Sequence, residues 1–277
     1  MRPSEIPGLS EHAESIWTPG QMASLRQRLE DLERHAHDGQ GRRVLFLVPP
    51  GNKCSGPLYE IVFMLETWAR EKEIRDRLEI VWSTYEGGFI QAFGPRLHDV
   101  VDDEFMQRGV LGFTDEVVTH IEEGVVHYQG GKTREYDLLI SFPPYIAAVD
   151  YEGFDTDDRG FLPTELETRL VSGHGNIYAP GDGGDFPVKQ AFLAFLQADA
   201  VADHITHQLT GSAVTTPFDP VSMCVMEMFD KATFAQVPLT LTGDPARPVA
   251  VREGAEDLYK VGVSPAWRIG RRPPATP

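Results

Sequence analysis

Cysteine is scarce in this chain: there are two in 277 residues, so neither a disulfide framework nor a zinc site of four cysteines can form. Basic residues are also few, because 25 Lys and Arg stand against 42 Asp and Glu and leave a formal charge of −17. Nucleic acids and broad anionic membrane surfaces attract basic proteins, so we expect neither as a partner. No run approaches the roughly 20 apolar residues that a membrane-spanning helix requires.

The two ends of the chain indicate where the protein works. Residues 1–17 lack the apolar core of a secretory signal, from which we expect a cytoplasmic protein. Three arginines near the C-terminus allow at most peripheral contact with a membrane: Arg268, Arg271 and Arg272. The apolar content of 41% and charged content of 24% are typical of a globular protein, and the length suggests about two domains.

The clearest pattern in the chain is a strand, a loop and a helix over residues 43–68. The continuous apolar run at 44–48 predicts a strand buried on both faces of a parallel sheet, and Pro49-Pro50-Gly51 ends it. A helix is predicted after Gly56-Pro57, because apolar side chains recur at helical spacing at Ile61, Met64, Leu65 and Trp68. In α/β folds such a crossover is where a dinucleotide phosphate normally lies.

The loop of this crossover carries a cysteine where a dinucleotide site has its glycines. It reads Asn52-Lys53-Cys54-Ser55. A cysteine beside a lysine and just before a helix N-terminus lies in a positive field that favours the thiolate. A small buried residue in a tight turn is the alternative, and the crossover geometry favours chemistry at Cys54.

Residues 176–205 form the second informative stretch. A short strand is predicted over 176–179, followed by Pro180-Gly181-Asp182 and by a helix that begins near Pro187. Asp182 at the carboxyl end of a strand could accept hydrogen bonds from sugar-like hydroxyls. Lys189 would lie in the first helical turn, where the helix dipole disfavours a cation, so an anionic partner is one reason for its presence.

The remaining patterns predict an α/β fold. The sequence Thr18-Pro19-Gly20-Gln21 is a capping box that begins a helix. A second strand is predicted over 78–82, and Glu86 after it is the nearest acidic residue for a ribose, although a surface loop fits better. Alternating side chains predict a three-stranded β-meander, and a small α+β unit follows from residue 211. The meander strands are predicted at 116–121, 125–128 and 134–140.

We expect no metal site from the sequence. His35 and His37 are two residues apart on a predicted helix and therefore face different directions. The aspartates at 155, 157 and 158 lack the spacing of a calcium-binding EF-hand loop.

Two of these segments resemble a known family. Lys53-Cys54-Ser55-Gly56-Pro57-Leu58-Tyr59-Glu60 is similar to a loop that carries one redox cysteine in the sulfide:quinone oxidoreductase branch of the two-dinucleotide-binding-domain flavoproteins. The segment from Thr168 through Asn176-Ile177-Tyr178-Ala179-Pro180-Gly181-Asp182 is similar to the second FAD motif of that superfamily. The order of crossovers, meander, FAD motif and C-terminal unit also matches.

The resemblance implies a cofactor and a set of roles. FAD would be bound through Asp182 and through the segment that leads into the following helix, which comprises Gly181, Pro187, Val188 and Lys189. Lys189 and the start of that helix would stabilise negative charge on the reduced flavin. Cys54 and Cys224 would form the redox pair that accepts sulfur from sulfide or a thiol and passes electrons through flavin to a quinone-like acceptor.

The resemblance also implies a domain organisation. Residues 1–18 and 142–209 would form part of an FAD-binding domain, 19–141 an NAD-binding-like domain, and 210–277 a dimerisation or quinone-side unit. By the same resemblance, we expect the chain to lack the glycine-rich βαβ unit with which family members begin. A truncated chain, a second chain that supplies the missing half, and a flavin-free module are the three explanations.

Two further functions compete with sulfide oxidation. One is an NAD(P)H-dependent flavin oxidoreductase of the type II NADH dehydrogenase kind. The other is a non-catalytic interaction module that binds no flavin.

Overall fold

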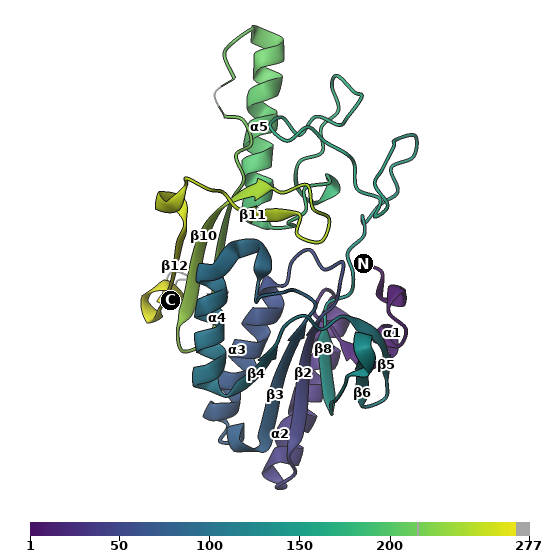
Figure 1. Cartoon of the computed structure of the whole chain (residues 1–277), viewed down its shortest axis with the longest axis vertical. Coiled ribbons are helices and arrows are strands. Elements are labelled where there is room, and N and C mark those ends of the chain that lie inside the picture. Colours follow the sequence, from purple (N-terminus) through teal and green to yellow (C-terminus); the bar gives the residue numbers. More distant parts are fainter. Residues whose placement is uncertain (215, 270–277) are drawn as a thin grey trace, which may run out of the picture. The chain divides into compact units, whose positions relative to one another are not determined.

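The structure is a computed structural model that describes residues 1–214 and 216–269, and its chain divides into two compact units (Figure 1). The unit that we call the sheet unit comprises residues 2–144, 225–234 and the chain from Val261 on. The other, the loop unit, comprises Met1 and residues 145–224 and 235–260. The domain boundaries implied by the resemblance stay a prediction.

A five-stranded parallel sheet forms the centre of the sheet unit, with the strand order β1-β8-β2-β3-β4. All neighbouring strands run in the same direction, as crossover connections require. The strands are β1 (Ala13–Glu14), β2 (Arg42–Val48), β3 (Leu78–Thr84), β4 (Val110–Phe113) and β8 (Leu138–Ser141). The helices are α1 (Leu9–His12), α2 (Pro19–His37), α3 (Gly56–Glu71) and α4 (Gly94–Arg108). The predicted α/β class with a Rossmann-like parallel sheet is confirmed.

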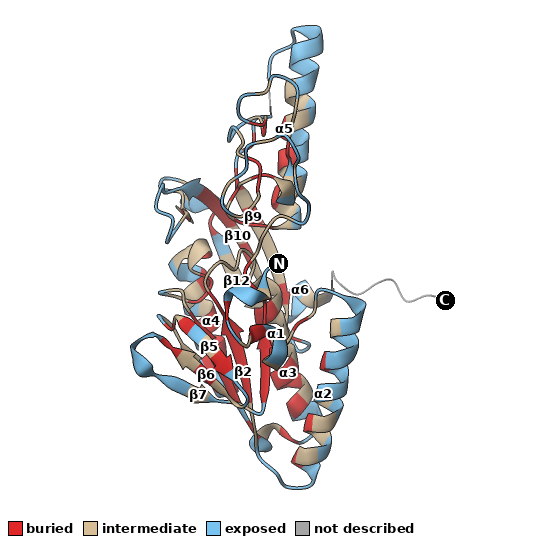
Figure 2. Ribbon diagram, turned by 90° about the vertical axis from the view of Figure 1, so that its right-hand side faces the viewer, coloured by how far each residue is buried: buried red, intermediate tan, exposed pale blue. Residues whose placement is uncertain are grey.

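Side chains alternate between the two faces of this sheet, and each face is covered. Helices α3 and α4 cover one face, where the Trp82 ring lies 3.8 Å from the Tyr59 ring and 5.7 Å from that of Phe105. Leu45 and Leu47 of β2 belong to the cluster on the other face, together with residues of the N-terminal turn and the meander. Figure 2 shows the central strands largely buried, and residues 44–48 of β2 are all buried, as the continuous apolar run predicts.

The three-stranded meander is also confirmed, with one correction. Its antiparallel strands are β5 (Val118–Glu122), β6 (Val125–Tyr128) and β7 (Thr133–Glu135). The predicted third strand at 134–140 was wrong, because β7 ends at Glu135 and Leu138 begins β8 of the parallel sheet. Asp137 makes the change: its backbone N–H donates to the carbonyl of Arg43, and its carboxylate accepts from the Arg43 N–H. All four residues of β8 are buried, which suits a central strand.

The loop unit is organised around α5 (Ala191–Thr210), and two predictions for it were wrong. In place of a strand at 176–179 there is a single bridge between Leu170 and Tyr178. The helix begins at Ala191 instead of near Pro187, because Gln190 is still extended. Lys189 therefore lies outside the helix, and its predicted place in the first turn is corrected.

Four strands near the C-terminus form a separate sheet with the order β11-β10-β12, in which β9 also pairs with β10. They are β9 (Val221–Glu227), β10 (Ala232–Leu241), β11 (Val249–Val251) and β12 (Lys260–Ser264), and α6 (Pro265–Ile269) follows. In α6, Arg268 donates from Nε to Glu227 at 2.8 Å. Arg271 and Arg272 lie outside the described residues.

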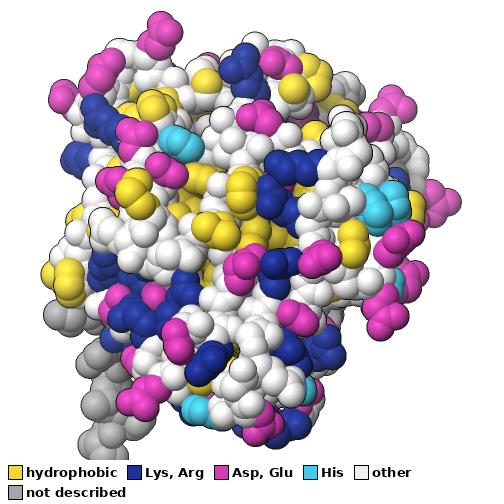
Figure 3. All heavy atoms as spheres, turned by 60° about the horizontal axis from the view of Figure 1, so that its bottom comes forward, with side chains coloured by type: hydrophobic (Ala, Val, Ile, Leu, Met, Phe, Trp, Pro, Cys, Tyr) yellow, Lys and Arg dark blue, Asp and Glu magenta, His cyan; other side chains and the backbone are white. Residues whose placement is uncertain are grey.

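Two features of the described residues concern contact with charged partners and with membranes. On the face drawn in Figure 3, Lys and Arg side chains are interspersed with Asp and Glu. Among the helices of the described residues, none combines the length and the hydropathy needed to cross a bilayer.

Candidate functional site

The Cys54 loop lies at the carboxyl end of β2, immediately before α3. Asn52 shapes it: its Oδ1 accepts a hydrogen bond from the Cys54 N–H at 2.9 Å, and its own N–H donates to the Pro49 carbonyl. The Asn52 Nδ2 is buried and has no hydrogen-bond acceptor within the described chain. The half-buried Cys54 thus stands beside an unused amide donor, at the edge of the sheet where parallel strands place their ligands.

A neighbouring loop at the same edge holds Glu86. Burial raises the pKa of the Glu86 carboxyl to about 7, although hydrogen bonds from Thr84 Oγ1 at 3.0 Å and Gln91 N–H at 3.1 Å oppose the rise. The surface loop favoured for this residue is thereby corrected to a half-buried loop that Glu86 itself holds together. Its carboxyl group can gain or lose a proton near neutral pH.

In the loop unit, Gly181 and Asp182 form a short turn ahead of α5. Gly181 has a φ of +75° and donates its N–H to Gln197 of α5 at 2.7 Å. A Cβ on Gly181 would lie 3.3 Å from that of Ala194, so the turn packs closely on the helix. Asp182 is exposed, and its carboxylate is accessible to a hydroxyl-bearing ligand.

Lys189 is buried in a loop and directed away from solvent. Its Nζ donates to the Gly184 carbonyl and lies 3.9 Å from the centre of the Phe161 ring. Val188 beside it is buried, and Pro187 is half-buried. The helix-dipole argument for Lys189 no longer applies, but a buried ammonium group still favours an anion nearby.

A second buried cation, missed by the sequence analysis, lies close to the same glycine. Arg169 is 1% exposed, its guanidinium contacts Asp185 at 3.4 Å, and burial lowers the pKa of Arg169. Its Nε has no hydrogen-bond partner among the described residues. A Cβ on Gly184 would lie 3.0 Å from Arg169 Nη2 and 2.6 Å from the Ala179 carbonyl, so this approach requires glycine.

Arg169 and Lys189 are two buried cations close to the same glycine, Gly184. Asp185 is the carboxylate that contacts one of them. This cluster is hard to recognise in the sequence, because twelve residues lie between Arg169 and Asp182 and loop hydrogen bonds bring them together. Only the FAD-motif resemblance of this segment pointed to it.

The structure brings some of the predicted site residues together in one unit, and it does not test the predicted pairing of the two cysteines. Gly181, Asp182 and Lys189 belong to one unit, around the start of α5. Cys54 belongs to the sheet unit and Cys224, which is half-buried in β9, to the loop unit. Both cysteines are thiols in the structure, and their pairing stays a prediction.

The loop-unit residues fit the flavin that the resemblance implies. An exposed Asp182 suits the hydroxyls of a ribityl chain. Arg169, Lys189 and the N-terminus of α5, which has no side-chain cap in the described chain, suit negative charge on a reduced ring.

One cavity of the sheet unit lies away from these residues. It has a volume of about 760 Å³ and is lined by residues at the amino ends of parallel strands, such as Arg42 and Leu78, and by meander residues such as Val125. No predicted site residue lines it. Because α/β sheets bind ligands at the carboxyl ends of their strands, we place no catalytic role in this cavity.

Comparison with known proteins adds to this geometry. No protein-family model matches the chain. The chain is 22% identical over 218 residues to the mitochondrial sulfide:quinone oxidoreductase of Dictyostelium discoideum, covering 75% of this chain and 48% of that protein. It therefore spans about half the length of this curated relative.

Solved structures share the fold. The sulfide:quinone oxidoreductase of Aquifex aeolicus matches with a TM-score of 0.72 and 19% identity, over 93% of this chain and 61% of that one. A NAD-dependent persulfide reductase from A. fulgidus matches with a TM-score of 0.52 and 16% identity, over 84% and 41% of the two chains. The predicted resemblance is confirmed: the chain is similar to sulfide:quinone oxidoreductases within the superfamily of FAD- and NAD(P)-dependent oxidoreductases.

Proposed function

We propose that this protein is a flavin-dependent oxidoreductase, or the larger part of one, that oxidises sulfide or a thiol and delivers the electrons to a quinone-like acceptor. The observation that carries the proposal is the Cys54 loop. It places a half-buried thiol ahead of the N-terminus of α3, in a field that favours the thiolate.

The reaction would use Cys54 and Cys224 as a disulfide in the oxidised protein. Hydrosulfide attacks one sulfur, so that one cysteine becomes a persulfide and the other leaves as a thiolate with the electron pair of the broken bond. A second thiol nucleophile then takes the outer sulfur of the persulfide and frees the first cysteine. The two thiolates lose two electrons as their disulfide closes again.

When bound, FAD would supply the two-electron acceptor chemistry that links these thiolates to the quinone-like acceptor. Asp182 would hold the hydroxyl-bearing chain of the cofactor. Arg169 and Lys189 would favour the reduced cofactor, because buried cations near Gly184 stabilise added negative charge. The side-chain amide of Asn52 would donate a hydrogen bond from its unused Nδ2 to a ligand bound beside Cys54.

Completing the flavin site would need a glycine-rich half, either from more of the same polypeptide or from a second chain. Helix α5 supports this, because much of it is exposed (Figure 2) and its exposed residues include an apolar stripe. Phe195 is 68% exposed and Leu209 81% exposed. The other members of the stripe are Ala198, Ala202 and Ile205.

Spectroscopy of the purified protein, with any chain that remains bound to it, tests the proposal. We expect visible flavin absorbance that sulfide bleaches without oxygen, and we expect Cys54→Ser to abolish the bleaching. Ser55→Ala is the matched control, because Ser55 makes no capping hydrogen bond to α3 through its side chain.

Each other result points to a competing function. Bleaching by NADH instead of sulfide would support the NAD(P)H-dependent enzyme. Protein that binds no flavin in any complex would contradict the proposal and favour the interaction module.

A further inference from the structure

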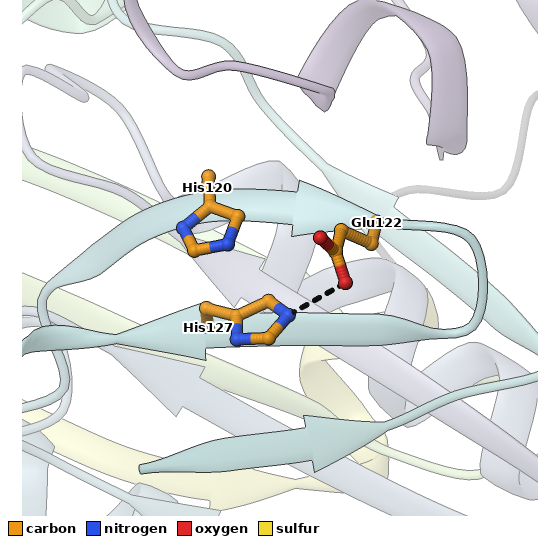
Figure 4. Close-up of side chains that lie close together, drawn as sticks. All are labelled: His120, Glu122 and His127. Atoms are coloured by element: carbon orange, nitrogen blue, oxygen red, sulfur yellow. Dashed lines mark hydrogen bonds and ion pairs between the residues drawn. The ribbon is translucent and has the colours of Figure 1, made fainter. Parts of the chain in front are cut away.

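The outward face of the β5–β6 hairpin carries two histidines and a glutamate in a triangle (Figure 4). His120 of β5 and His127 of β6 are directly opposite in the strand register, and Glu122 is two residues along β5 on the same face. The intervening residues Ile121 and Val126 point the other way and are buried in the core. The triangle is therefore a surface feature on a rigid, well-packed support.

The three side chains are close enough to share one ion. His127 Nε2 lies 3.2 Å from Glu122 Oε2, and the imidazole rings of His120 and His127 stack with centres 4.1 Å apart. The candidate ligand atoms of all three residues lie within 4.8 Å of one another. Metal–ligand bonds of about 2.0–2.2 Å place tetrahedral ligand atoms roughly 3.3 Å apart, so small side-chain rotations would suffice.

Thr119 prepares His120 to act as a ligand. Its hydroxyl donates to the His127 carbonyl at 3.1 Å, and the same oxygen lies 3.1 Å from His120 Nδ1. Because the single hydroxyl proton is already used, the oxygen must accept a hydrogen bond from Nδ1–H. In the neutral imidazole this leaves the lone pair on Nε2, the atom that would bind a metal.

The chemistry of the donors selects the kind of ion. Two imidazoles and one carboxylate suit Zn²⁺ and its first-row neighbours, whereas Ca²⁺ and Mg²⁺ require sites built of oxygen atoms. Three protein ligands leave one tetrahedral position for water or for another ligand from solution. An ordinary surface ion pair would need only His127 and Glu122, and it gives no reason for the stacked His120 with its oriented tautomer.

We propose that His120, Glu122 and His127 form a binding site for a divalent transition-metal ion, represented by Zn²⁺. No motif in the sequence indicates this site, because His120 and His127 are seven residues apart. Only the strand register, with its irregularity between Val118 and His120, brings them face to face. The proposal is independent of the flavin and of Cys54.

Calorimetric titration of the metal-free protein with Zn²⁺, and with Co²⁺ followed by visible absorption, tests the site. We expect one ion per chain, four-coordinate Co²⁺ bands and a melting temperature that rises with Zn²⁺. His120→Ala with His127→Ala should abolish all three responses. Glu122→Gln should weaken binding at least tenfold, and Thr119→Val should weaken it about tenfold, as loss of a hydrogen bond to a ligand does.

The matched control is His35→Gln with His37→Gln, which removes two histidines from α2 and should leave Zn²⁺ binding unchanged. The variants alter the solvent face of the hairpin, so their melting temperatures without metal should match the wild type. Zn²⁺ binding that survives in the double alanine variant, or wild-type protein that binds no Zn²⁺, would overturn the proposal.

Discussion

The two units of the molecule differ in how much of their main helix is buried. In the sheet unit, α3 buries eight side chains, and its parallel sheet is covered on both faces. In the loop unit, α5 is four residues longer but buries only three. The associated apolar cluster consists of Leu162, Val171 and Ala179, with partly buried neighbours.

The buried charges differ in the same way. Arg108 of the sheet unit bonds Glu66 at 2.8 Å, Glu104 at 3.0 Å and Asp230 at 2.8 Å, so that each of its nitrogens has a partner. Arg169 of the loop unit has a long contact to Asp185 and an unpartnered Nε among the described residues. Arg108 is therefore satisfied inside its core, whereas Arg169 keeps a donor that a ligand could use.

The largest effect is expected from Arg108→Met in the sheet unit. The substitution leaves three carboxylates without their shared cation, two of them almost completely buried, and should lower the free energy of unfolding by about 3–5 kcal/mol. Denaturant unfolding measures the loss. Arg26→Met is the control, because the exposed Arg26–Glu30 pair should contribute less than about 1 kcal/mol.

Two leucines compare the cores directly. Leu47→Ala in β2 removes a fully buried side chain and should cost about 2–5 kcal/mol, whereas Leu209→Ala on α5 should change stability by less than about 0.5 kcal/mol. Equal costs in denaturant unfolding would show that the α5 stripe is covered in the protein as purified, and would remove the contrast between the units.

Glu86→Gln tests the free-energy cost of burying an ionised carboxylate at the sheet edge. The folded-state pKa is raised to about 7 from 4.5, so ionisation of Glu86 lowers the stability of the fold progressively as the pH rises from 4.5 to 7, and the full cost is present above pH 7. The variant should be more stable than the wild type by about 3 kcal/mol above pH 7. This advantage should fade as the pH falls from 7 to 4.5, where the carboxyl group is protonated in both states. A constant difference across that range would contradict the raised pKa.

Among the substitutions of buried residues, Arg169→Met is expected to have the smallest effect on stability. Because Arg169 is buried with poor partners, its replacement should change the free energy of unfolding by less than about 1 kcal/mol, or raise it. Flavin binding, measured by absorbance titration, should weaken nonetheless. A large loss of stability without effect on flavin would assign Arg169 a structural role.

Local signals explain why much of the sheet unit could be predicted. The apolar run of β2 and the helical spacing of α3 were correct. The capping box also formed, with Gln21 N–H donating to Thr18 Oγ1 at 3.2 Å and Thr18 N–H to Gln21 Oε1 at 3.1 Å. Each of these depends on neighbours within a few residues, which the sequence displays directly.

Long-range contacts explain what was missed. The break at Asp137 depends on bonds to Arg43, and the buried state of Arg169 depends on how a long loop folds back. The facing histidines depend on strand register. The start of α5 was placed too early because Pro187 and the residues after it carry good helix signals, although Lys189 turns back to Gly184 instead.

Mass spectrometry of the protein after anaerobic exposure to sulfide is the most direct test of thiol-based redox chemistry. We predict that a peptide containing Cys54 or Cys224 gains the mass of one sulfur atom, and that Cys54→Ser protein gains none at either position. Flavin that is bleached by sulfide while both cysteine peptides keep their mass, in wild-type protein, would contradict the role assigned to these thiols.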